Sequence, residues 1–356
     1  MAHTIISAMA LIAPSLPRPT FEFKFAAAGS AKDTAVEDSS RMQVDVDPAG
    51  LCVRVGEDAY FVRKDGLGVA DGVGGWAHVF KGSNAALFSS RLMYHVASQL
   101  DYFDDLTNDY DINEYYLLDP IKVLQVACER TLEDAGKGAG SAVGSTTALI
   151  AFLRLYITYY SDDELRLASL GDSSLMILRD GAIIFRTEEQ QHSFNFPYQL
   201  GSNSKDTPEK DAGKWSVKIK EGDVVIVGSD GIFDNLFDED ILEIVNAVVL
   251  GTSATASFVH PSHYSSMASF PPVTTAKTPG AGSVLPARIL RTDPQLIASE
   301  ILAKARDIST DTSPNVSSPF QERAVNEGIY YQGGKSDDLT VVVGIIRVSE
   351  DSPDRR

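Results

Sequence analysis

The sequence has few cysteines, few basic residues and no long apolar runs. Its 356 residues include two cysteines, Cys52 and Cys128, which are too few for a disulfide framework or a four-cysteine zinc site. Lysine and arginine total 31 against 49 acidic residues, so the formal net charge is −18. The chain therefore lacks the basic surface that a non-specific nucleic-acid binder needs. The longest apolar stretch near the start, residues 5–13, is too short to span a membrane. We expect no nucleic-acid partner and no transmembrane segment.

A hydrophobic fraction of 44% is enough for a full core. We expect residues 1–48 to form a leader or disordered tail, because the first 32 residues are mildly basic within a very acidic protein, as in a transit peptide. Residues 49–349 are expected to form one folded domain, interrupted at 251–286 by a low-complexity insert of Ser, Thr, Ala, Pro and Gly. Residues 350–356 are expected to be a C-terminal tail.

Helices are expected in a few blocks and strands in runs. Asp119-Pro120 and Asp293-Pro294 each predict a capped helix start, and a continuous apolar run predicts a buried strand at 339–348. Asp180-Gly181 between two apolar segments predicts a hairpin turn. This pattern indicates an α+β fold with large, mostly antiparallel sheets.

Four acidic clusters each lie where an apolar strand meets a turn. They are Gly56-Glu57-Asp58, Ala70-Asp71-Gly72, Gly228-Ser229-Asp230 and Ser336-Asp337-Asp338. A carboxylate beside a buried strand is costly unless it is hydrogen bonded or bound to a cation. Any one of these clusters could be a simple turn, but their recurrence suggests that they converge.

The residue types favour Mg²⁺ or Mn²⁺ over zinc. The carboxylates are hard oxygen ligands, and the six histidines form no ligand-spaced pair such as His-x-x-x-His. Two such ions bridged by a carboxylate can hold a hydroxide between them, which attacks phosphorus in line.

At this point the sequence resembles the metal-dependent protein phosphatases of type 2C. The resemblance rests on five motifs in order: Asp71-Gly72-Val73-Gly74-Gly75-Trp76, Gly144-Ser145-Thr146-Thr147, Leu170-Gly171-Asp172-Ser173, Gly228-Ser229-Asp230-Gly231-Ile232-Phe233-Asp234 and Asp337-Asp338-Leu339-Thr340-Val341-Val342. It covers about residues 50 to 348. The segment Glu188 to His192, followed by Phe194-Asn195, is similar to the compact branch found in mitochondria and plastids.

The resemblance implies two packed antiparallel β-sheets flanked by helices, with the metals at one end of the sandwich. Asp71 would bridge two Mg²⁺ or Mn²⁺ ions. The Gly72 carbonyl would bind the second ion, and Asp230 and Asp337 would complete the first. Glu57 and Asp58 would serve catalysis by holding metal-bound waters.

The resemblance also extends to positions that are less uniform in the family. Asp172 and Asp234 match positions linked to a third, weaker metal. Asp338 stands where many members carry Asn. Many members carry a histidine, a proposed general acid, where this chain has Val73. Many also carry a phosphate-binding arginine where this chain has Val53, and Arg54 is a doubtful substitute because neighbouring strand residues face opposite sides.

The function expected from this resemblance is a Mg²⁺/Mn²⁺-dependent serine/threonine protein phosphatase that acts on phosphoprotein substrates without a covalent intermediate. The alternative is a catalytically silent phosphatase-fold module that binds a protein partner. A nucleotide-dependent enzyme is disfavoured, because the glycine-rich 66–75 region lacks both Gly-x-Gly-x-x-Gly and a Walker lysine. A monomer is the simplest expectation. The leader favours a mitochondrial location, with a cytoplasmic one as the alternative.

Overall fold

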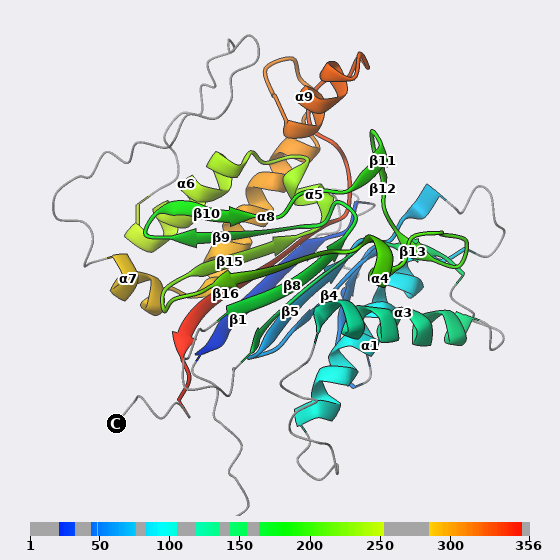
Figure 1. The fold of residues 1–356 in the computed structure, drawn as a ribbon. Coiled ribbons are helices and arrows are strands. Elements are labelled where there is room, and N and C mark those ends of the chain that lie inside the picture. The colour runs from blue at the N-terminus through cyan, green and yellow to red at the C-terminus, as the bar shows by residue number, and fades with distance from the viewer. Residues whose placement is uncertain are drawn as a thin grey trace, which may run out of the picture.

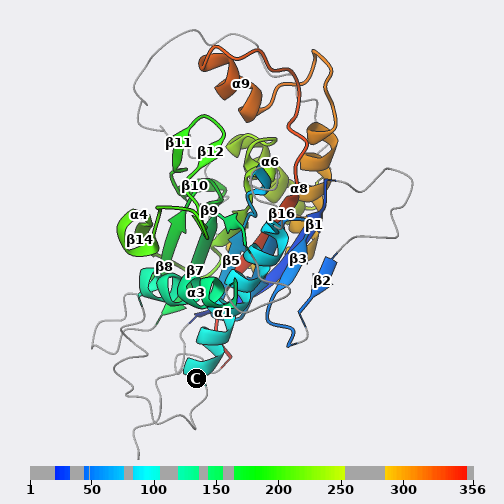
Figure 2. The ribbon, with the colours of Figure 1, turned by 90° about the vertical axis from the view of Figure 1, so that its right-hand side faces the viewer.

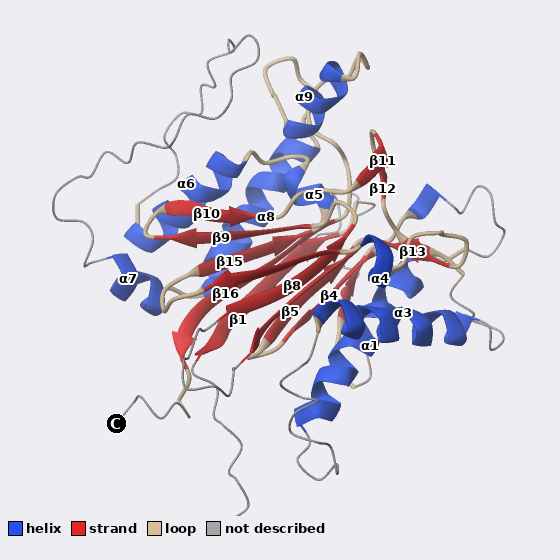
Figure 3. Cartoon of the chain, viewed as in Figure 1, coloured by secondary structure: helices blue, strands red, loops and turns tan. Residues whose placement is uncertain are grey.

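The computed structural model describes residues 21–32, 44–47, 49–75, 83–104, 119–135, 143–154, 164–252 and 285–350. Within them, two antiparallel sheets pack face to face, and helices cover the outer face of each sheet (Figures 1 and 3). The predicted α+β class, with two packed antiparallel sheets flanked by helices, is confirmed.

The first sheet has five strands in the order β1-β16-β15-β9-β10. Its strands are β1 (Phe21–Ser30), β16 (Leu339–Val348), β15 (Val224–Gly228), β9 (Ser174–Arg179) and β10 (Ala182–Arg186). Every residue of β15 is buried, because this central strand is covered on both faces. The β9–β10 hairpin turns at Asp180 and Gly181, both with positive φ (53° and 78°), as the Asp-Gly pair predicted.

The second sheet has seven strands in the order β14-β8-β7-β5-β4-β3-β2. Its strands are β14 (Gly213–Lys218), β8 (Glu164–Leu170), β7 (Ala148–Arg154), β5 (Gly66–Ala70), β4 (Asp58–Val62), β3 (Val53–Val55) and β2 (Val44–Val46). The core between the two sheets joins side chains of both, among them Phe23, Leu67, Leu149, Val225 and Val342.

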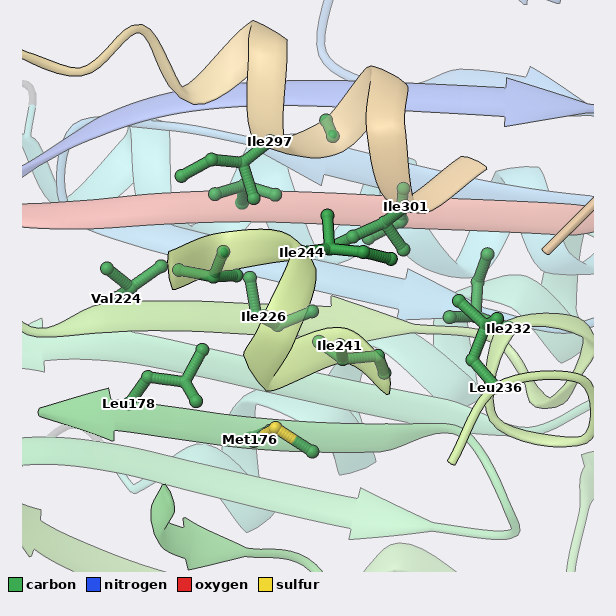
Figure 4. Close-up of a cluster of buried hydrophobic side chains, with 14 of the residues drawn as sticks. Met176, Leu178, Val224, Ile226, Ile232, Leu236, Ile241, Ile244, Ile297 and Ile301 are labelled. Atoms are coloured by element: carbon green, nitrogen blue, oxygen red, sulfur yellow. The ribbon is translucent and has the colours of Figure 1, made fainter. Parts of the chain in front are cut away.

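The longer helices form the two outer layers, and the shorter described helices lie around them (Figure 2). They are α1 (Ala85–Asp104), α3 (Pro120–Ala135), α4 (Pro208–Asp211), α5 (Asp230–Phe233), α6 (Asp238–Leu250), α7 (Leu285–Arg291), α8 (Pro294–Ser309) and α9 (Pro319–Asn326). Helices α1 and α3 cover the seven-stranded sheet. Helices α6 and α8 cover the five-stranded sheet, and Ile244, Ile297, Ile226 and Leu178 belong to the buried cluster that joins these helices to the sheet (Figure 4).

Short strands and helix caps complete the description. The short strands are β6 (Ser145–Thr146), β11 (Gln191–Ser193), β12 (Phe196–Pro197) and β13 (Leu200–Gly201). The predicted caps are confirmed, because Asp119 and Asp293 accept hydrogen bonds of 3.0 Å from the amides of Ile121 and Gln295. No helix in the described ranges combines the length and apolarity needed to cross a membrane.

The predicted boundary of the leader at residue 48 is wrong. Residues 21–30 form β1, which pairs antiparallel with β16 from Phe21↔Val348 to Ser30↔Leu339. The two strands lie side by side in Figure 1. Phe23 is 1% exposed in the core between the sheets, and Glu22 pairs with Arg347 at 2.6 Å. The alternation Phe-Glu-Phe-Lys-Phe at 21–25 carried this period-two signal, so a leader within this chain can include only residues before Phe21.

Two other predicted segments fall largely outside the described residues. They are the low-complexity insert at 251–286, of which 253–284 are not described, and the tail at 350–356. Helix α7 begins at Leu285, inside the predicted end of the insert.

Candidate active site

The carboxylates predicted to be functional gather at one end of the sandwich. Asp58 begins β4 and Asp71 follows β5, whereas Asp230 follows β15 and Asp337 precedes β16. Because β4 and β5 are antiparallel, as are β15 and β16, the end of one strand lies beside the start of its neighbour. Each sheet therefore brings its two acidic clusters to the same end.

Hydrogen bonds join the two sheets across this end. The Ser229 hydroxyl donates to Asp58 Oδ2 at 2.7 Å, and the Glu57 amide donates to Asp338 Oδ2 at 2.8 Å. Both bonds link a turn of the seven-stranded sheet to a turn of the five-stranded sheet. The relative position of the acidic clusters is thus fixed by backbone and hydroxyl contacts.

The Gly-Ser-Thr-Thr motif positions Asp71. The Thr146 hydroxyl donates to the Asp71 carbonyl at 2.7 Å, and the Asp71 amide donates to the Thr147 hydroxyl at 3.1 Å. The Thr147 amide also donates to the Asp71 carbonyl at 2.8 Å. Asp71 is therefore held from β6 and β7 at the point where β5 ends.

Gly72 lies where only a glycine fits. A Cβ at this position would lie 2.5 Å from the Glu57 carbonyl oxygen and 2.9 Å from the Ala85 backbone. This close approach places the Gly72 backbone between the β3–β4 turn and the start of α1, beside the acidic cluster.

A lysine that the sequence analysis missed lies among the carboxylates. Lys335 Nζ is 2.6 Å from Asp230 Oδ2, 2.6 Å from Asp234 Oδ2 and 3.2 Å from Asp337 Oδ2. Its side chain is only 14% exposed. The available signal was its position two residues before Asp337, in the same polar turn as a predicted ligand.

A second lysine lies at the rim of the same cluster. Lys32, just after β1, places Nζ 3.0 Å from Glu57 Oε2 and 3.6 Å from Asp337 Oδ1. Its backbone amide donates to Asp338 Oδ1 at 2.8 Å. Strand β1, assigned to the leader in the sequence prediction, therefore delivers a residue to the site.

Burial of so many acids in one place shifts their pKa values. Burial, and then the neighbouring carboxylates, raise the pKa of Asp58 and Asp71 well above the usual range. Burial likewise raises the pKa of Asp234 to about 7. Burial also acts to raise the pKa of Asp230, but its ion pair and hydrogen bond with Lys335 outweigh that effect and lower it to about 2. The cluster is thus short of positive charge.

Two carboxylate oxygens of the acidic cluster show the shortage of positive charge directly. Asp58 Oδ1 and Asp230 Oδ1 are buried and have no hydrogen-bond partner among the residues that the structure describes. Such orphaned acceptors are costly unless a cation or water meets them. Among the same residues, no three His, Cys, Asp or Glu side chains already surround a metal-sized position, and Lys335 lies between Asp230, Asp234 and Asp337. The all-oxygen donor set with unmet acceptors fits Mg²⁺ or Mn²⁺.

Asp172 and Asp234, the residues predicted for a third metal, lie close enough to Asp230 for their charges to interact. The charges of Asp230 and Asp234, together with burial as the largest cause, raise the pKa of Asp172. Its carboxylate accepts a hydrogen bond of 3.0 Å from Gln191. Asp234 forms ion pairs with Lys335 and Arg323. Both acids therefore already have partners within the protein.

The structure also bears on the two departures from the family pattern. Val73 donates its amide to the Ser145 carbonyl at 2.9 Å and carries no acidic proton. Val53 pairs with Tyr60 in the β3–β4 ladder. Arg63 is no phosphate clamp, because it follows β4 at the far end of the strand and pairs with Asp65 at 2.8 Å. Among the described residues, the cations that pair with carboxylates of the site include Lys32, Lys335 and Arg323.

His192, at the end of the segment that resembles the compact branch, packs against neighbouring side chains. Its ring stacks on Tyr198 at 4.0 Å between centroids, and Nε2 lies 2.9 Å from Asp206 Oδ2. These contacts hold the β11–β12 hairpin.

In a sandwich of two antiparallel sheets, buried carboxylates from both sheets meet at one end and form a candidate divalent-metal site. Comparison with known proteins specifies the class. "Probable protein phosphatase 2C 80" of Arabidopsis thaliana is 33% identical over 297 residues, which cover 83% of this chain and 55% of that protein. "Protein phosphatase PTC7 homolog fig" of Drosophila willistoni is 30% identical over 312 residues, covering 83% of this chain and 79% of that protein.

A solved structure agrees with these relatives. The X-ray structure of the photosystem II phosphatase PBCP aligns with a TM-score of 0.59 and 26% identity, over 91% of this chain and 99% of that chain. No family model matches the sequence. The chain belongs to the type 2C protein phosphatase family. It spans about half the length of the first curated plant relatives, 55% and 49%.

Proposed function

We propose that the protein is a Mg²⁺/Mn²⁺-dependent phosphatase that hydrolyses phosphoserine and phosphothreonine in proteins. The observation that carries this proposal is the convergence of buried, under-neutralised carboxylates from both sheets on one end of the sandwich. The proteins to which the chain is similar are named as protein phosphatases, which supports the same reaction.

The residues that would hold two ions are those predicted from the motifs. Asp71, the Gly72 carbonyl, Asp230 and Asp337 would coordinate them directly. Glu57 and Asp58 would bind through water. When bound, the two ions would supply a hydroxide at neutral pH and offset charge on the phosphoryl oxygens.

The surrounding residues orient these ligands before any substrate arrives. Thr146 and Thr147 fix the backbone of Asp71. The Ser229 hydroxyl donates to Asp58 Oδ2, and Asp58 Oδ1 has no hydrogen-bond partner among the described residues. Preorganisation of this kind lowers the cost of holding a reactive geometry, because the side chains need not be ordered during the reaction.

The two cysteines are poor nucleophiles, which agrees with attack on phosphorus by water rather than by a protein side chain. Burial raises the pKa of the Cys52 thiol to about 12 and that of Cys128 to about 11. Both are therefore protonated at neutral pH, and a thiol is a far weaker nucleophile than a thiolate. Neither cysteine can form a phosphoenzyme intermediate readily.

The test is turnover of a phosphothreonine peptide by the purified chain with Mn²⁺, with EDTA, and with the Asp230→Asn variant in Mn²⁺. We expect EDTA to abolish turnover and Asp230→Asn to lower kcat by more than about 100-fold, because the variant removes a charged ligand. Asp293→Asn is the matched control, since asparagine also caps α8 well and this position lies outside the site.

Turnover that survives EDTA or Asp230→Asn would refute the two-metal proposal. A folded protein with no turnover in any condition would instead favour the partner-binding module. We further propose that residues before Phe21 act as a cleaved mitochondrial leader. Sequencing of the mature N-terminus from cells tests this proposal, and an intact Met1 would argue against it.

A further inference from the structure

Lys32 carries its charge on the rim of the acidic cluster, and its backbone is fixed there. It lies two residues beyond β1, whose last pair with β16 is Ser30↔Leu339. Its amide donates to Asp338 Oδ1 at 2.8 Å. The strand pairing and this hydrogen bond hold the main chain of Lys32 at the end of the sandwich where the carboxylates meet.

The Lys32 ammonium retains the capacity to bind a further oxygen. It donates to Glu57 Oε2 at 3.0 Å, whereas Asp337 Oδ1 lies 3.6 Å away, beyond hydrogen-bond distance. An ammonium has three donor hydrogens, and the Lys32 side chain is 35% exposed. An oxygen that arrives from solvent can therefore accept a hydrogen bond from Lys32 without displacing Glu57.

Lys335 lacks this capacity. Its Nζ lies 2.6, 2.6 and 3.2 Å from the carboxylates of Asp230, Asp234 and Asp337, so each of its three hydrogens has a carboxylate to meet. Its side chain is only 14% exposed. Its amide donates to Asn235 Oδ1 at 2.8 Å, and its carbonyl accepts from Asn235 Nδ2 at 2.9 Å, which also bonds to α5. This lysine is an internal counter-ion of the site.

Arg323 is exposed to a similar extent, 36%, but it faces other acids. Its guanidinium pairs with Asp234 and, at 3.7 Å, with Glu189. Neither acid is among the residues assigned to the two ions. Lys32, in contrast, contacts two members of that set. Of these three cations, Lys32 is therefore the one that both adjoins the proposed ion ligands and is open to solvent.

A phosphorylated side chain brings up to about two negative charges into a cluster that is already acidic. A cation at the entrance offsets this repulsion and can hydrogen bond to the phosphoryl oxygens. We propose that the Lys32 ammonium binds a phosphoryl oxygen of the phosphoserine or phosphothreonine substrate. This inference rests on the proposed function, and it assigns recognition of the phosphate to a residue outside all five sequence motifs.

The test measures phosphate affinity separately from turnover. Wild-type protein and Lys32→Gln are loaded with Mn²⁺, and the binding of radiolabelled inorganic phosphate is followed by equilibrium dialysis. We expect Lys32→Gln to raise the Kd for phosphate by about 10-fold, because it removes a charge-assisted hydrogen bond. In turnover of a phosphothreonine peptide, KM should rise by a similar factor while kcat changes little, as expected when a contact is made equally in the ground and transition states.

Lys24→Gln is the matched control. Lys24 also lies on β1, but its Nζ donates to the Thr292 carbonyl at 2.8 Å, and this variant should bind phosphate as the wild type does. Lys32→Arg keeps the charge and should stay close to the wild type. Lys32→Met removes the charge but keeps the apolar stem, and it tests the inference where Lys32→Gln does not fold.

The outcomes separate this inference from the proposed function. Wild-type phosphate affinity in a folded Lys32→Gln or Lys32→Met variant would overturn the role of Lys32 while leaving a metal phosphatase intact. A weaker Mn²⁺ affinity in that variant, measured by the same dialysis, would also overturn it, because the lysine would then act on the ion ligands and not on phosphate. A wild type that neither binds Mn²⁺ nor turns over the peptide would overturn the proposed function itself.

Discussion

Single residues decide how the acidic cluster is held together, and Gly56 is the clearest case. It lies in the β3–β4 turn with a φ of +62°, a conformation that favours glycine. The Asp338 carboxylate occupies the space beside it and accepts hydrogen bonds from the amides of Glu57 and Lys32. Asp338, which directly precedes β16, therefore ties the β3–β4 turn to the residues that follow β1. The two acceptor oxygens of its carboxylate suit it to this role.

Replacing Gly56 by alanine should be far more costly than replacing a glycine that only turns the chain. A Cβ at Gly56 would overlap the Asp338 carboxylate, which adds an overpacking cost to the strain of a positive φ. We expect Gly56→Ala to lower the free energy of unfolding by about 3 kcal/mol in urea titrations. Gly50→Ala is the control, because Gly50 has a φ of +72° with nothing within 4 Å. Equal losses in the two variants would show that the contact with Asp338 has no energetic role.

At the scale of elements, β1 connects the core to the site. Its ten residues pair with β16 along the edge of the five-stranded sheet, and its apolar side chains pack between the sheets. The residues that follow it place Lys32 against Glu57 and Asp337. An element at the beginning of the chain thus completes both the sheet and the rim of the candidate active site.

Replacing Phe23 tests how much β1 contributes to the stability of the fold. It is 1% exposed in the core between the sheets, so Phe23→Ala should lower the free energy of unfolding by about 3 kcal/mol or more. Phe196→Ala, at a side chain that is 45% exposed in β12, should cost about 0.5 kcal/mol. Urea titrations of both variants measure the difference. A Phe23→Ala variant as stable as wild type would mean that β1 is not part of the folded core.

At the scale of the whole molecule, the acidic cluster couples stability to pH and to metal. Six of its carboxyl groups have raised pKa values, with burial as the largest cause in each: Asp58, Asp71, Asp172, Asp234, Asp337 and Asp338. The folded chain therefore holds protons that the unfolded chain releases. The net charge of −18 adds general repulsion as pH rises.

Without metal, stability should fall as pH rises. For Asp234 the window runs from the ordinary value of 3.8 to about 7, and across it the folded state binds more protons than the unfolded state. In EDTA we expect Tm to drop by roughly 5–10 °C between pH 5 and pH 7.5. Saturating Mn²⁺ should reverse or abolish this drop, because the bound ions stabilise the charged carboxylates. A Tm in EDTA that rises over the same interval would contradict the raised pKa values.

Much of the fold and the site followed from local patterns in the sequence. A continuous apolar run predicted β16, Asp-Pro pairs predicted the starts of α3 and α8, and Asp180-Gly181 predicted the hairpin between β9 and β10. These features depend on neighbours in the chain, and short-range sterics and capping determine them. The recurrence of acids at strand ends also predicted that Asp71, Asp230 and Asp337 would converge, since antiparallel neighbours begin and end together.

Tertiary structure alone decided which charges meet. Strand β1 is stabilised by β16, more than 300 residues away in the chain, so its short alternating pattern was not sufficient to separate it from a leader. Lys335 resembles any polar turn residue in the sequence, and it becomes an internal cation only because Asn235 clamps it to α5. The sequence by itself determined the acids and their spacing. Packing of the two sheets determined which of those acids a lysine neutralises and which remain available for metal, because ion pairing depends on distances that only the folded chain sets.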